Sequence, residues 1–133
     1  MRSAARAWRA TSGARKECKD GDVLYRQGDL ADTIDFVAAG TLAISLDDGR
    51  GSLRRVRRCT RRTVLGEMGF FREVRRAATI STEGSALIYT LSRRNLERMQ
   101  RERPELYEAF LRFIIRALSD RLELAHKEVA ALT

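Results

Sequence analysis

Short extended segments, separated at close intervals by glycine, constrain the fold of this 133-residue chain most strongly. Between residues 21 and 91, brief apolar runs alternate with turn signals such as Gln27-Gly28-Asp29 and Asp47–Gly51. The run Leu42–Leu46 alternates most clearly between apolar and small or polar side chains. Short strands at this spacing predict a mainly β domain, built as a small antiparallel barrel or jelly roll.

The strands are expected in seven places. They are Val23–Tyr25, Ile34–Val37, Leu42–Leu46, Leu53–Cys59, Thr63–Leu65, Ala77–Thr82 and Ala86–Leu91. Gly40 separates the second run from the third, and Glu83-Gly84-Ser85 is expected to be the turn between the last two. The fourth run carries arginines at both odd and even positions, so alternation does not predict which of its faces is buried.

The last third of the chain is predicted to be helical. Ser92 is a suitable N-cap for a helix ending near Glu102, and Pro104 suits the first turn of a longer helix toward Leu132. One apolar seam follows 4-3 spacing through Leu111, Ile115, Leu118, Leu122, Ala125, Val129 and Leu132. A second stripe comprises Leu106, Phe110, Phe113 and Ala117. The pattern favours one stripe on the barrel and the seam in a homodimer. The alternative is a single broad intramolecular core.

Composition excludes several classes of protein. With 44% hydrophobic and 33% charged residues, the chain is typical of one globular domain that needs no disulfide to hold its core. Cys18 and Cys59 lie in no metal-binding or redox motif, which favours the reducing cytoplasm. No apolar run approaches the roughly 18 residues of a membrane span. Residues 1–17 form a separate basic segment, which we interpret as a frayed helix or the start of a fragment rather than an organelle transit peptide.

The net charge of +8 is concentrated in one region. Residues 17–53 contain three basic and eight acidic side chains, whereas residues 54–76 contain nine arginines and two glutamates. The positive charge therefore surrounds the stretch from Gly66 to Ile80. Such clustering attracts polyanions through their phosphates, but no nucleic-acid recognition element accompanies it.

The stretch Gly66–Ile80 has the residue types of an anion pocket. A glycine and a carboxylate follow a short strand, an amphipathic turn ends in Arg75-Arg76, and the next strand begins with two alanines. If this segment leaves the sheet and returns to it, Glu67 and Arg76 face each other across a pocket. One cation, one carboxylate and the backbone N–H groups of a helix start would then suit an anion that carries a sugar.

A cyclic nucleotide monophosphate meets this description. Its single phosphate charge is balanced by one guanidinium, Arg76, and its ribose 2′-hydroxyl needs an acceptor such as Glu67. The remaining residues would shape the pocket. Gly66 and Gly69 permit close backbone approach, Ala77 and Ala78 leave room beside the phosphate, and Val64 and Leu65 line the base.

Residues 18–125 resemble the cyclic nucleotide-binding domain family. The resemblance rests on Gly28-Asp29, Gly40, the Gly66-Glu67-Met68-Gly69 sequence, and the Arg76-Ala77-Ala78-Thr79-Ile80 sequence. It implies a jelly-roll barrel over residues 18–103, with a phosphate-binding cassette at 66–80.

The same resemblance implies how the domain works. Helices at both ends flank the barrel, and residues 104–133 form a lid and dimerisation helix that moves on binding. Glu67 would hold the ribose, Arg76 the phosphate, and the N–H groups of Met68 and Gly69 would add donors. Ala77 favours cAMP over cGMP. Neither catalysis nor a cofactor is implied.

Two sequences point to a possible effector. Gly-Glu-Met-Gly-Phe-Phe and Arg-Glu-Arg-Pro-Glu-Leu-Tyr resemble those of domains appended to bacterial SulP-type anion transporters. This resemblance implies a cytoplasmic sensor that controls an attached or partner effector. Three residues depart from the family pattern. Arg62 replaces a turn glycine, Arg75 a small residue or proline, and Asp35 an apolar residue.

Other functions remain as alternatives. A catabolite-activator-type regulator shares the barrel and the dimer helix, but a helix-turn-helix would have to follow, and none does in this sequence. A barrel that has lost nucleotide binding and serves as an interaction module also fits the pattern. A cupin-type metal enzyme does not fit, because the single histidine, His126, falls on the C-terminal helix.

Overall fold

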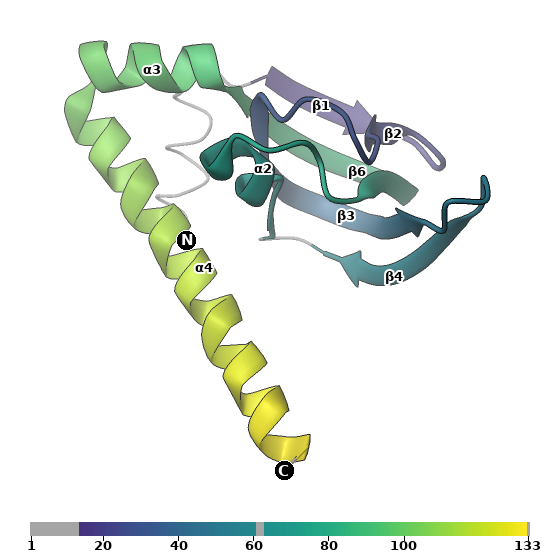
Figure 1. The fold of residues 1–133 in the computed structure, drawn as a ribbon. Coiled ribbons are helices and arrows are strands. Elements are labelled where there is room, and N and C mark those ends of the chain that lie inside the picture. Colours follow the sequence, from purple (N-terminus) through teal and green to yellow (C-terminus); the bar gives the residue numbers. More distant parts are fainter. Residues whose placement is uncertain (1–13, 61–62, 133) are drawn as a thin grey trace.

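The computed structural model describes residues 14–60 and 63–132, and its core is one antiparallel sheet of six strands flanked by helices (Figure 1). The strands are β1 (Ala14–Cys18), β2 (Val23–Tyr25), β3 (Thr33–Asp47), β4 (Leu53–Cys59), β5 (Val64–Leu65) and β6 (Thr79–Ser92). The helices are α2 (Glu67–Arg72), α3 (Arg93–Glu102) and α4 (Pro104–Leu132). The predicted class, mainly β with α, is confirmed.

Two long strands organise the sheet. β3 and β6 pair along nearly their whole length, and the strand order is β1-β6-β3-β4. Two short strands are added to this frame: β2 pairs with β6, and β5 pairs with β3. In the described residues, β1 and β4 therefore have one sheet neighbour each.

The prediction of a break at Gly40 and of a turn at Gly84 was wrong. β3 continues through Gly40 and β6 continues through Gly84, and the register of their pairing shifts between Gly40 and Thr41. Gly40 has φ +92°, and a Cβ there would lie 2.2 Å from the Ser85 carbonyl oxygen. The pairing passes from Gly40–Ala86 to Thr41–Glu83, so Gly84 and Ser85 form a bulge in β6, and Gly40 leaves the space that this bulge needs. In the local sequence, a bulge of this kind looks the same as a turn.

Alternation along β3 divides the core into two clusters. Ile34 and Phe36 contribute to a cluster that α3 and α4 complete, whereas Val37 and Leu42 belong to a second cluster that includes Leu65 and Ile80. Apolar side chains are therefore packed on both faces of the long strands β3 and β6.

Helix α4 packs on the barrel through its first half. Phe110 and Ile114 are buried, and Phe113 meets Phe36 edge to face with ring centroids 5.7 Å apart. The predicted stripe of Leu106, Phe110, Phe113 and Ala117 does cover the barrel. Beyond this contact, the C-terminal half of α4 projects away from the sheet (Figure 1).

The predicted helix starts are correct. The Ser92 hydroxyl accepts a hydrogen bond from the Asn95 amide at 3.1 Å, which caps α3, and Pro104 is the first residue of α4. At the other end of the chain, β1 begins at Ala14, inside the segment expected to precede the barrel. The expected N-terminal helix and Arg62 lie outside the described residues.

Candidate functional site

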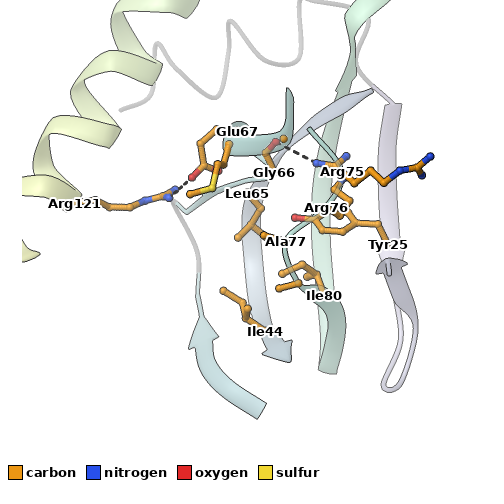
Figure 2. A pocket seen from close by; sticks show the side chains of 13 residues that line it. Tyr25, Ile44, Leu65, Gly66, Glu67, Arg75, Arg76, Ala77, Ile80 and Arg121 are labelled. Carbon is orange, nitrogen blue, oxygen red and sulfur yellow. Dashed lines mark hydrogen bonds and ion pairs between the residues drawn. The ribbon is translucent and has the colours of Figure 1, made fainter. Parts of the chain in front are cut away.

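A cavity of about 150 Å³ lies where the β5–α2 turn, the segment before β6 and helix α4 meet (Figure 2). Its lining comprises Tyr25, Ile44, Leu65, Gly66, Glu67, Met68, Gly69, Arg75, Arg76, Ala77, Ala78, Ile80 and Arg121. Eight of the nine residues expected at the ligand site are among them. The segment Gly66–Ile80 thus folds around a pocket.

Arg76 is a buried cation in the wall of this pocket. Its side chain enters from the segment before β6, and 5% of the residue is exposed. Nη2 donates to the backbone oxygen of Thr33 at 2.9 Å and to its hydroxyl at 2.7 Å, while Nη1 donates to the Gly66 oxygen at 3.1 Å. The guanidinium also lies 3.9 Å from the centre of the Tyr25 ring. These contacts hold the cation in one orientation.

The charge of Arg76 is not balanced by these contacts. Among the described residues, no carboxylate lies within ion-pair distance of its guanidinium. Its Nε atom is buried without a hydrogen-bond partner in the described structure. A buried, unpaired cation with an unused donor is costly. An anion bound in the cavity would remove that cost.

Gly66 makes room for Arg76. Its φ of +79° is a left-handed conformation, and a Cβ would stand 2.2 Å from Nη1 of Arg76. Gly69, in α2, also lines the pocket. A Cβ there would lie 2.6 Å from the Ala31 Cβ and 2.9 Å from the Val74 oxygen, so the packing of α2 against these neighbours requires a glycine.

Helix α4 reaches the pocket through Arg121. Its Nη1 lies 2.5 Å from Oε1 of Glu67, and its Nη2 donates to the Val64 oxygen. Figure 2 shows the side chain extending from α4 to the start of α2. The carboxylate expected to hold a ribose is therefore paired with the long helix in this structure.

The other end of the pocket is apolar. Leu65, Ile44 and Ile80 line it, with Ala77 between them and Arg76 (Figure 2). Val64 does not line the cavity. It alternates with Leu65 in β5 and points into the cluster around Phe36 and Phe70.

A second cavity of about 280 Å³ lies on the other side of Tyr25 and Arg76. It is lined by Lys16, Leu24, Tyr25, Asp29, Leu30, Asp32, Thr33, Asp35, Arg76 and Thr90. Asp35 is 3% exposed and accepts a hydrogen bond from the Thr90 hydroxyl at 2.6 Å. Burial raises the pKa of Asp35, while the Thr90 bond and the Arg76 charge oppose that shift. Burial also raises the pKa of Tyr25.

Arg75 lies at the exposed rim, and its Nη1 donates to the Gly28 oxygen at 2.9 Å. Of the other five lining residues, Arg75 and Ile80 fall inside the predicted cassette but were given no part in the ligand site, whereas Tyr25, Ile44 and Arg121 lie outside it. Ile44 and Ile80 could have been found from strand alternation, since each is an apolar residue of a predicted strand. Tyr25 and Arg121 carry no local signal, because tertiary packing alone brings them to residues 66–80.

The predicted seam on α4 is largely exposed. Leu111 packs partly against the barrel, whereas Ile115, Leu118, Leu122, Ala125 and Val129 face outward. None of the described helices is long and apolar enough to cross a membrane. The described residues also contain no group of three or more His, Cys, Asp or Glu side chains placed to hold a metal ion.

The family model named "cyclic nucleotide-binding domain" matches residues 15–103, which is most of the chain and includes the whole of Gly66–Ile80. The chain belongs to this family. Solved structures share the fold. A cyclic nucleotide-binding domain from Methylobacillus flagellatus has a TM-score of 0.76 at 18% identity, covering 90% of this chain and 67% of that one.

Two regulators have the same fold. The c-di-GMP-responsive regulator CLP of Xanthomonas campestris has a TM-score of 0.79 at 20% identity, covering 99% of this chain and 64% of that protein. The catabolite activator protein of Thermus thermophilus has a TM-score of 0.72 at 21% identity, covering 98% and 59% respectively.

A curated relative is Glutaminase 1 of Bradyrhizobium diazoefficiens, which is 27% identical over 115 residues. The match covers 86% of this chain but spans 18% of the length of that enzyme.

Proposed function

We propose that this domain is a cyclic nucleotide sensor with a preference for cAMP. The observation that carries the proposal is Arg76. It is a buried cation in a pocket wall, without an ion-pair partner among the described residues and with an unused Nε–H. Three of its five N–H donors are used by the protein, and the other two, the Nε–H and one on Nη1, have no hydrogen-bond partner in the described structure. A cyclic phosphate diester supplies the one negative charge that such a site needs.

The remaining lining suits the other parts of the nucleotide. Glu67 lines the same pocket as Arg76 and offers an acceptor for the ribose 2′-hydroxyl. The first-turn N–H groups of α2, at Met68 and Gly69, offer further donors to the phosphate. Leu65, Ile44 and Ile80 provide an apolar surface for the base.

The preference for cAMP is supported by Ala77. Its methyl group lines the pocket where a hydroxyl side chain would offer guanine a further hydrogen bond. A structural neighbour from Toxoplasma gondii, a PKA regulatory domain with a TM-score of 0.58 and 21% identity, is described in complex with cAMP. Another neighbour is described within a cyclic-GMP-dependent signalling pathway, so the choice between the two nucleotides has to rest on the lining of this pocket.

We infer that α4 transmits occupancy of the pocket. The cavity of about 150 Å³ is smaller than the roughly 300–1,000 Å³ of typical small-molecule sites, so a nucleotide requires movement of a wall. Helix α4 forms one wall through Arg121, whose partner Glu67 is also the ribose acceptor. A ribose that binds Glu67 would release Arg121 and change the equilibrium position of α4.

In this proposal, the domain acts within a larger assembly that contains the effector it controls. The exposed seam of α4 suits a second copy of the chain. The match to Glutaminase 1, which spans 18% of that enzyme, supports a place for the domain within a longer protein. An attached or partner effector, such as a transporter or an enzyme in the cytoplasm, would receive the signal. The domain itself is a sensor without catalytic activity.

Ligand-dependent thermal stability tests the proposal. At 100 times its dissociation constant, a ligand adds about 2.7 kcal/mol to the free energy of unfolding. For a chain of this length we expect the Tm to rise by about 8–12 °C with cAMP and less at the same concentration of cGMP. AMP is the control, because its phosphate is a monoester that carries a second negative charge and is not closed into a ring with the ribose. The absence of a shift with either cyclic nucleotide at millimolar concentration would contradict the proposal.

A further inference from the structure

Strand β4 has an unusual combination of position and charge. It lies at the end of the sheet, and its backbone pairs with β3 on one side while its outer side has no strand partner among the described residues (Figure 1). Six of its seven residues are exposed. Four of them are arginines: Arg54, Arg55, Arg57 and Arg58.

The register divides these arginines between the two faces of the sheet. Arg58 pairs with Ala43 and Arg55 with Ser45, whereas Arg57 pairs with Ile44 and Arg54 with Leu46, because a bulge at Val56 shifts the alternation. Directly opposed residues in an antiparallel pair share a face. Arg55 and Arg58 are therefore on one face, and Arg54 and Arg57 are on the other.

The two faces differ in charge compensation. On one face, both arginines pair with the same carboxylate, with Arg55 and Arg58 at 2.9 Å and 2.7 Å from Glu83. These bonds lower the pKa of Glu83. On the other face, the described structure contains no ion pair to Arg54 or Arg57. The uncompensated charge is thus confined to one side of the strand.

Apolar side chains accompany the charge. Leu53 pairs with Asp47 and lies on the face of Arg55, where 59% of it is exposed. Val56, at the bulge, is 49% exposed. A strand added to the outer side of β4 would therefore meet unpaired arginines on one face and apolar surface beside neutralised arginines on the other.

We propose that β4 is a docking strand for an extended segment of a partner protein in which acidic and apolar side chains alternate. Main-chain hydrogen bonds to the free side of β4 would hold the segment, and its acidic side chains would face Arg54 and Arg57. Like charges exclude the same strand of a second copy, because arginines would oppose arginines. A nucleic-acid backbone fits less well, since Glu83 presents a carboxylate on one face and phosphates gain nothing from the strand's N–H and C=O groups.

A labelled peptide of alternating glutamate and valine tests the docking strand by fluorescence anisotropy with the full chain. We expect saturable binding that weakens with salt, and at least a tenfold loss in the variant Arg54→Glu/Arg57→Glu. The matched control is Arg94→Glu/Arg98→Glu on α3, which changes the net charge equally at two exposed arginines far from β4. Its binding should stay within about twofold of the wild type.

N-methylated peptides separate strand pairing from attraction of any polyanion. In an extended segment, the N–H groups of alternate residues point to the same edge. One peptide methylated on its valines and one methylated on its glutamates should therefore differ, with one losing binding and the other retaining it. Equal binding of both, stronger binding of an oligothymidine of similar charge, or no binding of the unmodified peptide at millimolar concentration would overturn the proposal. None of these outcomes depends on nucleotide binding at Arg76.

Discussion

At the scale of single residues, Asp35 places a buried carboxyl group behind the proposed phosphate site. Its folded-state pKa is raised by burial, so the ionised form is penalised in the folded protein. The folded state then binds more protons than the unfolded state at pH values between the ordinary carboxyl pKa and the raised one. Stability from this group is therefore present at low pH and is lost as pH rises through that interval.

The variant Asp35→Asn should remove this loss. Above the raised pKa the variant should unfold at a higher urea concentration than the wild type, and the difference should shrink as pH falls toward the ordinary carboxyl pKa. Asp32→Asn, an exposed carboxylate in the same cavity, is the control and should change little. A difference between Asp35→Asn and the wild type that is constant with pH would contradict the assignment.

Gly66 is expected to be more sensitive than other glycines with the same backbone conformation. Gly66 and Gly49 have φ values of +79° and +78°, but a Cβ at Gly49 would meet nothing within 4 Å. Gly49→Ala should therefore cost the strain of a left-handed residue, about 1–2 kcal/mol in unfolding experiments. Gly66→Ala adds a clash with Arg76 and should cost clearly more, with weaker nucleotide binding. An equal loss of unfolding free energy in the two variants would mean that the Arg76 side chain moves away from the new Cβ at no energetic cost, which would contradict the prediction.

At the scale of elements, Arg121 connects α4 to the pocket. If the nucleotide ribose competes with Arg121 for Glu67, Arg121→Gln should bind cAMP a few times more tightly, because the competing ion pair is gone. Arg116→Gln, at an exposed arginine five residues earlier on the same helix, should leave the affinity unchanged. A weaker affinity for Arg121→Gln, measured by titration with a fluorescent nucleotide, would show that Arg121 supports the bound ligand instead.

The elements also show what the sequence can and cannot predict. The strand alternation, the Ser92 cap and Pro104 are local signals, and the elements that they predicted are present. Gly40 and Gly84 were misread as breaks, because a bulge between long paired strands depends on the partner strand. Glu67 and Arg76 were brought to one pocket as expected. Arg121, 54 residues from Glu67, could not be foreseen, since its position depends on how α4 packs.

At the scale of the whole molecule, the exposed row on α4 is predicted to hold two copies together. Ile115, Leu122 and Val129 are each about 60% exposed. Exposed apolar rows of this kind mark interaction sites. Leu118→Glu/Leu122→Glu should halve the mass measured by sedimentation equilibrium.

Leu124→Glu provides the control for this measurement. Leu124 is on the same helix and 56% exposed, but it lies outside the 4-3 seam. Its variant should remain a dimer. A seam variant with unchanged mass, or a wild-type chain that sediments as a monomer, would contradict the predicted interface.

The central claim is that Arg76 is the cation of a cyclic nucleotide site, and calorimetric titration of cAMP tests it most directly. We expect one nucleotide per chain in the wild type. In Arg76→Gln we expect a loss of about 2–5 kcal/mol, at least about 30-fold in Kd. Arg75→Gln removes the neighbouring, exposed charge and should cost less than about fivefold. No binding heat in the wild type, or equal losses in the two variants, would contradict the account.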